Sequence, residues 1–404
     1  MRLPYPLRAL AHRDYRLFWI GQLVSRVGTW MQSVAQAWLV LELTGSPLKL
    51  GVISTLQFSP VLLFAFVGGV VSDRVRKRRL IIATQVAMMG QAAVLAVLAG
   101  SGHVEYWHVA VLAAVYGIAN ALDMPARQSY VIELTGKADL MSAIALNSAV
   151  FNAARVIGPA LAGVLIATQG VTTAFALNAV SFVAVLAALW AMRTEGAPAV
   201  RESRTVREDV VEGLRYATRT PLVMLALGLV LFVSLFVINF NVTVPLLARD
   251  ALNEGAHVYG LLMACLGAGA MIGALAVASR QRRPSPRMVM LAAAVASGGV
   301  LALGFVHSFA VAAAVLVVTG LAQIMFTSSV NTTIQLTVPD TMRGRTMSLY
   351  VLVFVGVTPL GAFLTGWVAE HFGIAWALTA GGAAGLASVG GLYAFWSLRA
   401  RATG

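Results

Sequence analysis

The chain has 404 residues, of which 59% are hydrophobic and only 11% are charged. Soluble globular domains carry about 25% charged residues, so this composition excludes an ordinary soluble protein and indicates an integral membrane protein. The net charge is +13, but the bases occur in short clusters between long apolar runs. That distribution predicts orientation in a membrane and no nucleic-acid partner.

Apolar runs of about 20 residues, the length that crosses a bilayer core, recur along the whole chain. We predict twelve spans: 17–41, 49–71, 80–100, 106–126, 141–168, 171–192, 221–247, 257–279, 288–306, 309–331, 344–369 and 372–398. The polar stretch 193–220 separates two groups of six, 1–192 and 221–404. Its first half is typical of a flexible linker, and the charge spacing of its second half favours a surface helix.

The positive-inside rule gives this topology an orientation. With twelve spans, both ends of the chain lie on one side, and all but four of the 29 Lys and Arg residues fall in the tails, loops and linker of that side. Lys49 and Arg249 lie on the opposite side, and Arg26 and Arg155 lie within spans. We therefore expect both termini to be cytoplasmic.

The densest charge cluster follows the second span, in GGVVSDRVRKRRLII (68–82). Its pattern resembles the loop motif that major facilitator transporters carry after their second helix, although the family's second glycine is an arginine here. The resemblance implies a cytoplasmic gating role in which Asp73 latches the two halves near span 344–369. The bases alone would also hold a tight hairpin in the cytoplasm, so both readings stay open for them. The motif residues are Gly69, Asp73, Arg74, Arg76, Lys77 and Arg78.

Further segments support the same resemblance. IELTGKADL from residue 132 and IQLTVPDTM from residue 334 echo each other, as expected for the parallel repeats of this superfamily. NAARVIGPALAGVLI (152–166) resembles the fifth-helix motif of its drug exporters, with Gly158, Pro159 and Gly163. RVGTWMQSVAQAWLVLELTGSP (26–47) and DMPARQSYVIEL (123–134) resemble the bacterial secretion-effector branch, which includes enterobactin and macrolide exporters.

The resemblance implies an all-α membrane protein of two six-helix bundles in the bacterial inner membrane. It implies export of an amphipathic or hydrophobic small molecule (a drug, a siderophore or a lipid-like compound) by alternating access with proton antiport. A monomer is the default expectation. No nucleotide partner is expected, because G-x-x-x-x-G-K-[ST] does not occur in the sequence. No cofactor or metal is expected either, and the single Cys265 has no clear histidine partner for enzymatic chemistry.

Polar side chains recur at helical spacing within several spans, while 80–100 and 288–306 are nearly bare of them. Lipid does not satisfy such groups, so they face protein or a water-filled cavity. For any single polar residue, hydrogen bonding between helices, at about 0.6 kcal/mol per contact, is a sufficient explanation. Taken together, the polar stripes favour a cavity, because the family that the chain resembles lines its pathway with helices 1, 4, 7 and 10. The candidates are Gln22, Arg26, Thr29, Ser33, Gln36, Tyr116, Asn120, Asn152, Arg155, Asn239, Asn241, Gln323 and Thr327.

Arg26 and Arg155 stand out because a charge at the bilayer centre costs at least about 2.5–3.5 kcal/mol. Either they meet an anionic part of a substrate, or Arg155 bonds backbone carbonyls freed at Gly158-Pro159 or reaches Asp123. Asp123 can also simply pair with Arg127 on its own helix. Asp73, Asp123 and Glu42 are the candidates for proton coupling.

Two other classes of function compete with transport. A membrane-embedded enzyme is rejected, since no nucleophile, acid–base pair or metal cluster has the required spacing. A transport-inactive sensor or scaffold on the same fold remains the alternative, although neither the short tails nor the linker resembles a signalling appendage.

Overall fold

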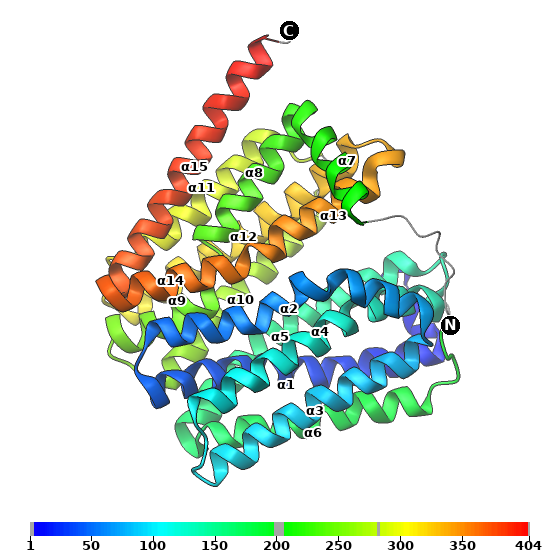
Figure 1. Ribbon diagram of the computed structural model, residues 1–404, viewed down its shortest axis with the longest axis vertical. Helices are drawn as coiled ribbons and strands as arrows, with labels where there is room; N and C mark the ends of the chain where they lie inside the picture. Colours follow the sequence, from blue (N-terminus) through cyan, green and yellow to red (C-terminus); the bar gives the residue numbers. More distant parts are fainter. Residues whose placement is uncertain (1–3, 198–205, 281–282, 403–404) are drawn as a thin grey trace. The chain divides into compact units, whose positions relative to one another are not determined.

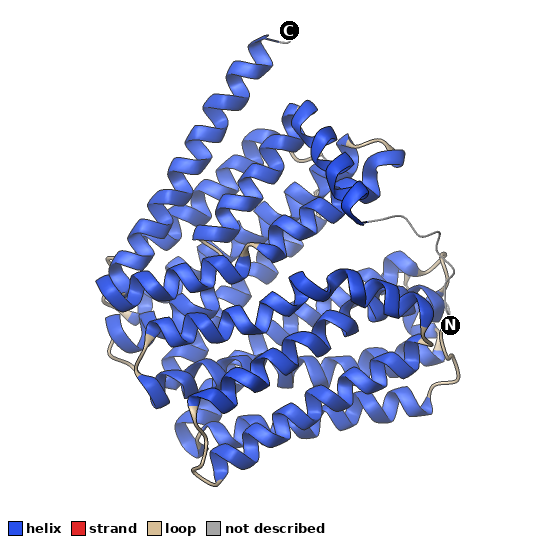
Figure 2. Cartoon of the chain, in the orientation of Figure 1, coloured by secondary structure: helices blue, strands red, loops and turns tan. Residues whose placement is uncertain are grey.

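The computed structural model describes residues 4–197, 206–280 and 283–402. These residues form helices joined by loops and turns, with no strand among them, which confirms the all-α expectation (Figure 2). Among the described residues, eleven helices are long and apolar enough to cross a membrane, and they correspond to the expected spans other than 17–41. That span lies within α1 (Arg13–Thr44), whose stripe of polar and charged residues lowers its hydropathy. Twelve spans therefore remain a prediction.

The chain divides into two compact units. Unit 1 comprises Met1–Gly45 and Leu56–Glu202, and unit 2 comprises Ser46–Thr55 and Ser203–Gly404. Helix α2 (Pro47–Arg74) contributes to both, because its first turns pack within unit 2. There, the Ser46 hydroxyl donates to Glu370 at 2.7 Å and the Thr55 hydroxyl donates to the Pro359 carbonyl at 2.9 Å.

Unit 1 is a bundle whose helices lie side by side (Figure 1). Helix α1 packs against α5 and α6, and α3 packs against α4 and α6. Small residues permit this close approach: a Cβ added to Gly28 would lie 2.3 Å from the Ser181 hydroxyl. The helices, besides the short 3-10 helix η1 (Tyr5–Ala11), are α3 (Lys77–Gly100), α4 (Tyr106–Thr135), α5 (Leu140–Gln169) and α6 (Val171–Ala191).

In the second segment of unit 2, Ser203–Gly404, the first helix is the amphipathic α7 (Val206–Arg219), which confirms the surface helix expected in the second half of the linker. Within this unit, α10 and α12 are the two helices that pack most extensively against each other. The remaining helices are α8 (Pro221–Phe236), α9 (Phe240–Leu246), the π-helix η2 (Leu247–Ala251), α10 (Ala256–Ala278), α11 (Pro286–Leu303), α12 (Phe309–Thr337), α13 (Asp340–Gly356), α14 (Thr358–Phe372) and α15 (Ile374–Ala402).

Two of the expected spans are interrupted helices. The chain leaves helical geometry between α8 and α9, and again at Val357 between α13 and α14. At the first break the Asn239 side chain donates to the Leu235 carbonyl at 2.8 Å. Helix α14 approaches this break closely, since a Cβ on Gly361 would lie 2.5 Å from the same carbonyl oxygen. Irregular backbone at membrane depth is tolerated where protein covers it, as here.

Candidate functional site

Asp123 on α4 is the centre of a buried polar network in unit 1. Its Oδ1 accepts hydrogen bonds from the Thr84 hydroxyl at 2.7 Å and from Gln85 Nε2 at 3.1 Å, both on α3. Its Oδ2 pairs with Arg127 one turn along α4, and only 3% of the Asp123 side chain is exposed. The expectation that span 80–100 is nearly bare of polar groups is therefore misleading, because its few polar residues are the partners of this carboxylate.

Arg26 on α1 adds a second positive charge to this network. It interacts electrostatically with Asp123, Arg127 and Tyr116 on α4. One acid thus faces two arginines, and Arg127 Nη1 has no hydrogen-bond partner among the described residues. The buried Gln22 Nε2, one turn from Arg26, likewise lacks an acceptor within the described part of the chain. Against these two donors stands one buried acceptor of the network without a partner among the described residues, Gln85 Oε1, so this face keeps an excess of donors.

Arg155 on α5 occupies an aromatic environment. Its guanidinium lies 5.9 Å from the ring centroid of Trp30 on α1. Trp30 in turn meets Phe151 edge to face at 5.7 Å. Gly158 makes this contact possible, because a Cβ there would lie 2.6 Å from the Trp30 Cβ. The arginine therefore makes a cation–π contact, an interaction worth about 2 kcal/mol or more when desolvated.

A hollow of about 510 Å³ adjoins this cluster between α4 and α5, within the size range of small-molecule sites. Phe151 and Asn152 belong to its lining. Asn152 donates to the Ser148 carbonyl at 2.8 Å, while its buried Oδ1 accepts from none of the described residues. The other lining residues are Gln128, Val131, Ile132, Leu140, Ile144, Asn147 and Ser148.

The fifth-helix residues Gly158, Pro159 and Gly163 are all buried. Helix α5 continues from Leu140 to Gln169 across Pro159 without a break. Close packing of α5 on α1 is therefore what the structure shows for this motif.

Other predicted stripe residues on α1 are used for packing. Gln36 donates to Gln57 Oε1 at 3.3 Å, and the Thr29 hydroxyl bonds the Ser25 carbonyl of its own helix. A buried relay that the sequence does not reveal runs beside them: Gln32 donates to Gln91 at 2.8 Å and accepts from Asn178 at 2.6 Å. Ser33 and Asn120 are half-buried.

The candidates in unit 2 lie at the break between α8 and α9, on α9 and on α12. Asn239 is buried at the helix break, and its Oδ1 has no partner within the described residues. Asn241 is half-buried on α9, and Gln323 is buried on α12. The Thr327 hydroxyl donates to the Gln323 carbonyl at 3.1 Å. Each unit therefore carries its own set of buried polar groups.

The candidate coupling acids have different surroundings. Glu42 is exposed near the end of α1 and accepts from Trp38 at 2.7 Å. Asp123 is buried, as described above. The surroundings of Gly69 and of the Asp73 side chain lie outside what the structure describes, so the latch to span 344–369 remains a prediction. Arg74 is exposed at the end of α2.

The remaining bases of the loop motif bind the last turn of α6 and the chain that follows it. Arg76 pairs with Glu195. Arg78 Nε donates to the Leu189 carbonyl at 2.6 Å, and the Arg78 backbone donates to the Glu195 carbonyl at 3.1 Å. Lys77, only 3% exposed, pairs with Glu133 at 2.6 Å and also donates to the Ala197 carbonyl. We call the segment Arg193–Ala197 the strap; the expectation of a flexible linker is wrong for it.

Asp14 holds the strap from α1. Its Oδ2 accepts from the backbone amides of Arg193 and Thr194 and from the Thr194 hydroxyl, each at 2.9 Å. Burial raises the pKa of Asp14, but the hydrogen bonds from Thr194 and Arg193 outweigh it and leave that pKa below its ordinary value. Gly196 adopts a φ of 75°, and a Cβ there would lie 2.9 Å from the Lys77 Cβ. This position therefore requires glycine.

Trp30 and Phe151 are functional candidates that sequence reasoning missed. Trp30 stands four residues after Arg26, and Phe151 four residues before Arg155, so each shares a helix face with an intramembrane arginine. An aromatic ring at that spacing is the signal that the sequence carries for them.

The chain matches the model of the family described as transmembrane secretion effector over residues 5–402. It is 29% identical to the multidrug efflux pump Tap of Mycolicibacterium fortuitum, covering 89% of this chain and 90% of the relative. It is 24% identical to the staphyloferrin A transporter of Staphylococcus aureus, covering 89% of this chain and 90% of that one. It is 27% identical to the enterobactin exporter EntS of Salmonella typhimurium, covering 88% and 85%.

Solved structures show the same fold at low sequence identity. A POT family transporter crystallised with 5-aminolevulinic acid superposes with a TM-score of 0.76 at 10% identity, covering 95% of this chain and 96% of that one. A D-xylose-proton symporter superposes with a TM-score of 0.72 at 15% identity, covering 94% and 96%.

Proposed function

Since the chain belongs to the transmembrane secretion effector family, and is a multi-pass membrane transporter and not an enzyme, we propose that it exports an amphipathic small molecule with an anionic group. Relatives named as efflux pumps and as transporters of siderophores support export of small molecules. Alternating access between two units is the mechanism that the fold favours.

The observation that carries the anionic preference is the excess of intramembrane cations and donors in unit 1. Arg26 and Arg127 face one carboxylate, that of Asp123. Arg155 lies against Trp30, which shares a face of α1 with Arg26. Arg127 Nη1 and Gln22 Nε2 still lack acceptors among the described residues. A buried donor without an acceptor costs about 1–3 kcal/mol, so a ligand that supplies acceptor oxygens is favoured there.

Proton antiport is the proposed energy source. Asp123 is the proposed coupling group, because it is buried, is paired with Arg127 within the electrostatic reach of Arg26, and is joined to α3 through Thr84 and Gln85. Protonation would weaken its hold on Arg127 and free that guanidinium for a substrate anion. The inner membrane, cytoplasmic termini and a monomeric state belong to the same proposal.

The test uses purified protein in proteoliposomes and a matched pair of aromatic amphiphiles that differ only in the charge of one group. We expect the anionic member to bind and to drive proton movement, and R26Q or R155Q to weaken its binding at least tenfold, since truncating one partner of a buried charge pair costs about 2–5 kcal/mol. R79Q, at an exposed arginine in the first turn of α3, is the matched control.

If the cationic member binds as tightly as the anionic member, and if its affinity is the same in R26Q and R155Q as in the unaltered protein, both arginines are structural. If both compounds bind, but neither is transported across the membrane and neither causes proton movement, the sensor or scaffold alternative replaces export.

A further inference from the structure

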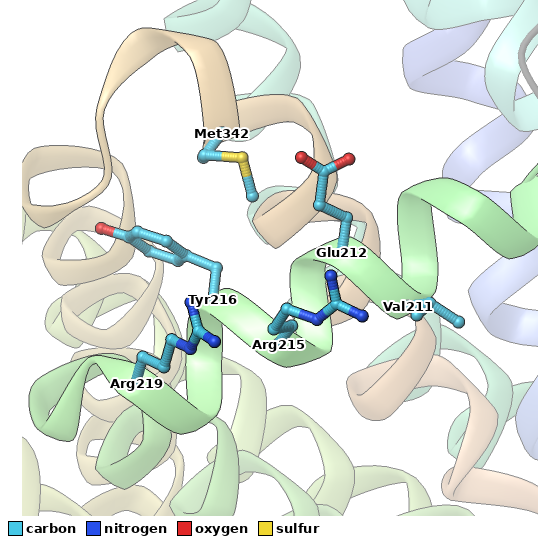
Figure 3. A pocket seen from close by; sticks show the side chains of 6 residues that line it. All are labelled: Val211, Glu212, Arg215, Tyr216, Arg219 and Met342. Carbon is cyan, nitrogen blue, oxygen red and sulfur yellow. The ribbon is translucent and has the colours of Figure 1, made fainter.

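A hollow of about 400 Å³ lies on unit 2, apart from the residues of the proposed transport site. Figure 3 shows that its lining comes mainly from α7, with one side chain from the beginning of α13. The lining residues are Val211, Glu212, Arg215, Tyr216, Arg219 and Met342.

Helix α7 is fixed on α13 by its inner face. Glu212 pairs with Arg345 at 2.6 Å, and a Cβ on Gly213 would lie 3.1 Å from the Arg345 carbonyl oxygen. Ala217, one turn further, is buried. These contacts define which side of α7 points away from the unit.

The outer face of α7 combines apolar and basic side chains. Val211 is 49% exposed and Leu214 is 53% exposed. Arg215 and Arg219 are exposed beside them, and neither has an ion-pair partner among the described side chains. Exposed apolar residues next to unpaired bases are typical of helices that lie in a membrane interface.

The hollow lies where two candidate membrane spans begin. The span Pro221–Ala251 starts two residues after Arg219, and the span Met342–Phe372 starts at the lining residue Met342. Lipid headgroups occupy this level of a bilayer, immediately outside the hydrocarbon core. Under the predicted orientation it is the cytoplasmic leaflet.

We propose that this hollow binds the headgroup phosphate of an anionic phospholipid, with Arg215 and Arg219 holding the phosphate and Val211 and Leu214 contacting the acyl chains. Guanidinium groups match phosphate oxygens geometrically. The Tyr216 ring suits the same boundary, because tyrosine has an apolar body and a polar tip. The apolar pair favours a lipid over a free phosphate ion. This binding does not depend on the proposed substrate.

The experiment titrates the full-length protein, in a neutral detergent, with phosphatidylglycerol and counts bound lipid by native mass spectrometry. We expect R215Q/R219Q to lower the affinity for phosphatidylglycerol roughly thirtyfold, because each base near an anionic lipid contributes about a factor of five. Binding of phosphatidylcholine should stay the same. The matched control is R283Q/R287Q, which removes two exposed bases at the mouth of another span.

Equal losses in the two double variants would overturn the proposal, because they would reflect surface charge alone. Inorganic phosphate that competes as strongly as phosphatidylglycerol would also overturn it, by assigning the hollow to a soluble anion. V211S/L214S provides a test that leaves the arginines in place: it should weaken phosphatidylglycerol binding and leave competition by inorganic phosphate unchanged. Unaltered phosphatidylglycerol binding in this variant would contradict the lipid assignment.

Discussion

At the scale of single residues, Asp123 is the most consequential side chain of unit 1. Four other groups depend on it: Thr84 and Gln85 as donors, and Arg127 and Arg26 as charges. Its removal leaves two intramembrane arginines without their acid. Its role in proton coupling, as proposed, thus rests on a group that also supports the fold.

We predict that D123N destabilises the protein by about 3–5 kcal/mol, because it leaves the Arg127 guanidinium buried and uncompensated. The double variant D123N/R127Q should recover most of this loss. Thermal unfolding in detergent of these two variants and of R127Q completes a double-mutant cycle, in which the departure of the double variant from the sum of the two single losses is the coupling energy. Additive losses in the double variant would mean that the pair does not interact as described.

The sequence predicts some of these residues and not others for a physical reason. Helical periodicity is a local property, so the sequence alone places Gln22, Asp123 and Asn152 on inward faces. The partners of Asp123 on α3, and Trp30 beside Arg155, depend on which helices pack together, and periodicity carries no such information. The side-chain face is predictable, whereas the hydrogen-bond partner is not.

At the scale of elements, close helix contact holds unit 2 together. A Cβ on Gly269 of α10 would lie 1.9 Å from the Val317 carbonyl oxygen, and one on Gly320 of α12 would lie 2.1 Å from the Leu266 carbonyl oxygen. Each helix thus rests its backbone on a glycine of the other. In a membrane, packing of this kind replaces the hydrophobic effect as the force between helices.

We predict that G269A lowers the stability of the protein by about 1–3 kcal/mol, because the added methyl group must push α12 away. G298A is the matched control, since nothing lies within 4 Å of its Cβ position on α11. The control should be neutral or stabilising, as alanine is the better helix former by about 1 kcal/mol. Similar melting temperatures for the two variants would count against this packing.

At the scale of the whole molecule, the strap changes where the connection between the units begins. The sequence predicts a flexible linker from 193, because Gly196 and the neighbouring polar residues carry no helical or strand periodicity. The structure binds Arg193–Ala197 to unit 1 through Asp14, Lys77 and Tyr130, which donates to the Thr194 carbonyl. Such docking depends on residues far away in the chain, which composition does not reveal.

We predict that D14A speeds amide hydrogen exchange at Arg193 and Thr194 about tenfold or more, because each loses an acceptor that carries a charge. R79A, with an exposed side chain in the same region, should leave the exchange unchanged. Unaltered protection of both amides in D14A would show that the strap is held by its other contacts alone.

The pH dependence of the strap follows from the lowered pKa of Asp14. A carboxyl group whose pKa is lowered by folding stabilises the folded state above its ordinary value of 3.8, and that contribution is lost as the pH falls through the lower value. Titration of Asp14 should therefore cause no change between about pH 5 and 8 in the protection of the Arg193 and Thr194 amides against hydrogen exchange, once the pH dependence of intrinsic exchange is corrected for. A loss of protection in that window would require another titrating group.

The excess of arginines over acids in unit 1 has an electrical consequence. A bacterial cytoplasm is negative relative to the outside, and moving one elementary charge through about 100 mV is worth about 2.3 kcal/mol. An anion that leaves the cell through Arg26, Arg127 and Arg155 travels with this voltage, whereas a cationic drug would travel against it. For the substrate proposed here, the membrane potential itself drives export, in addition to any proton gradient.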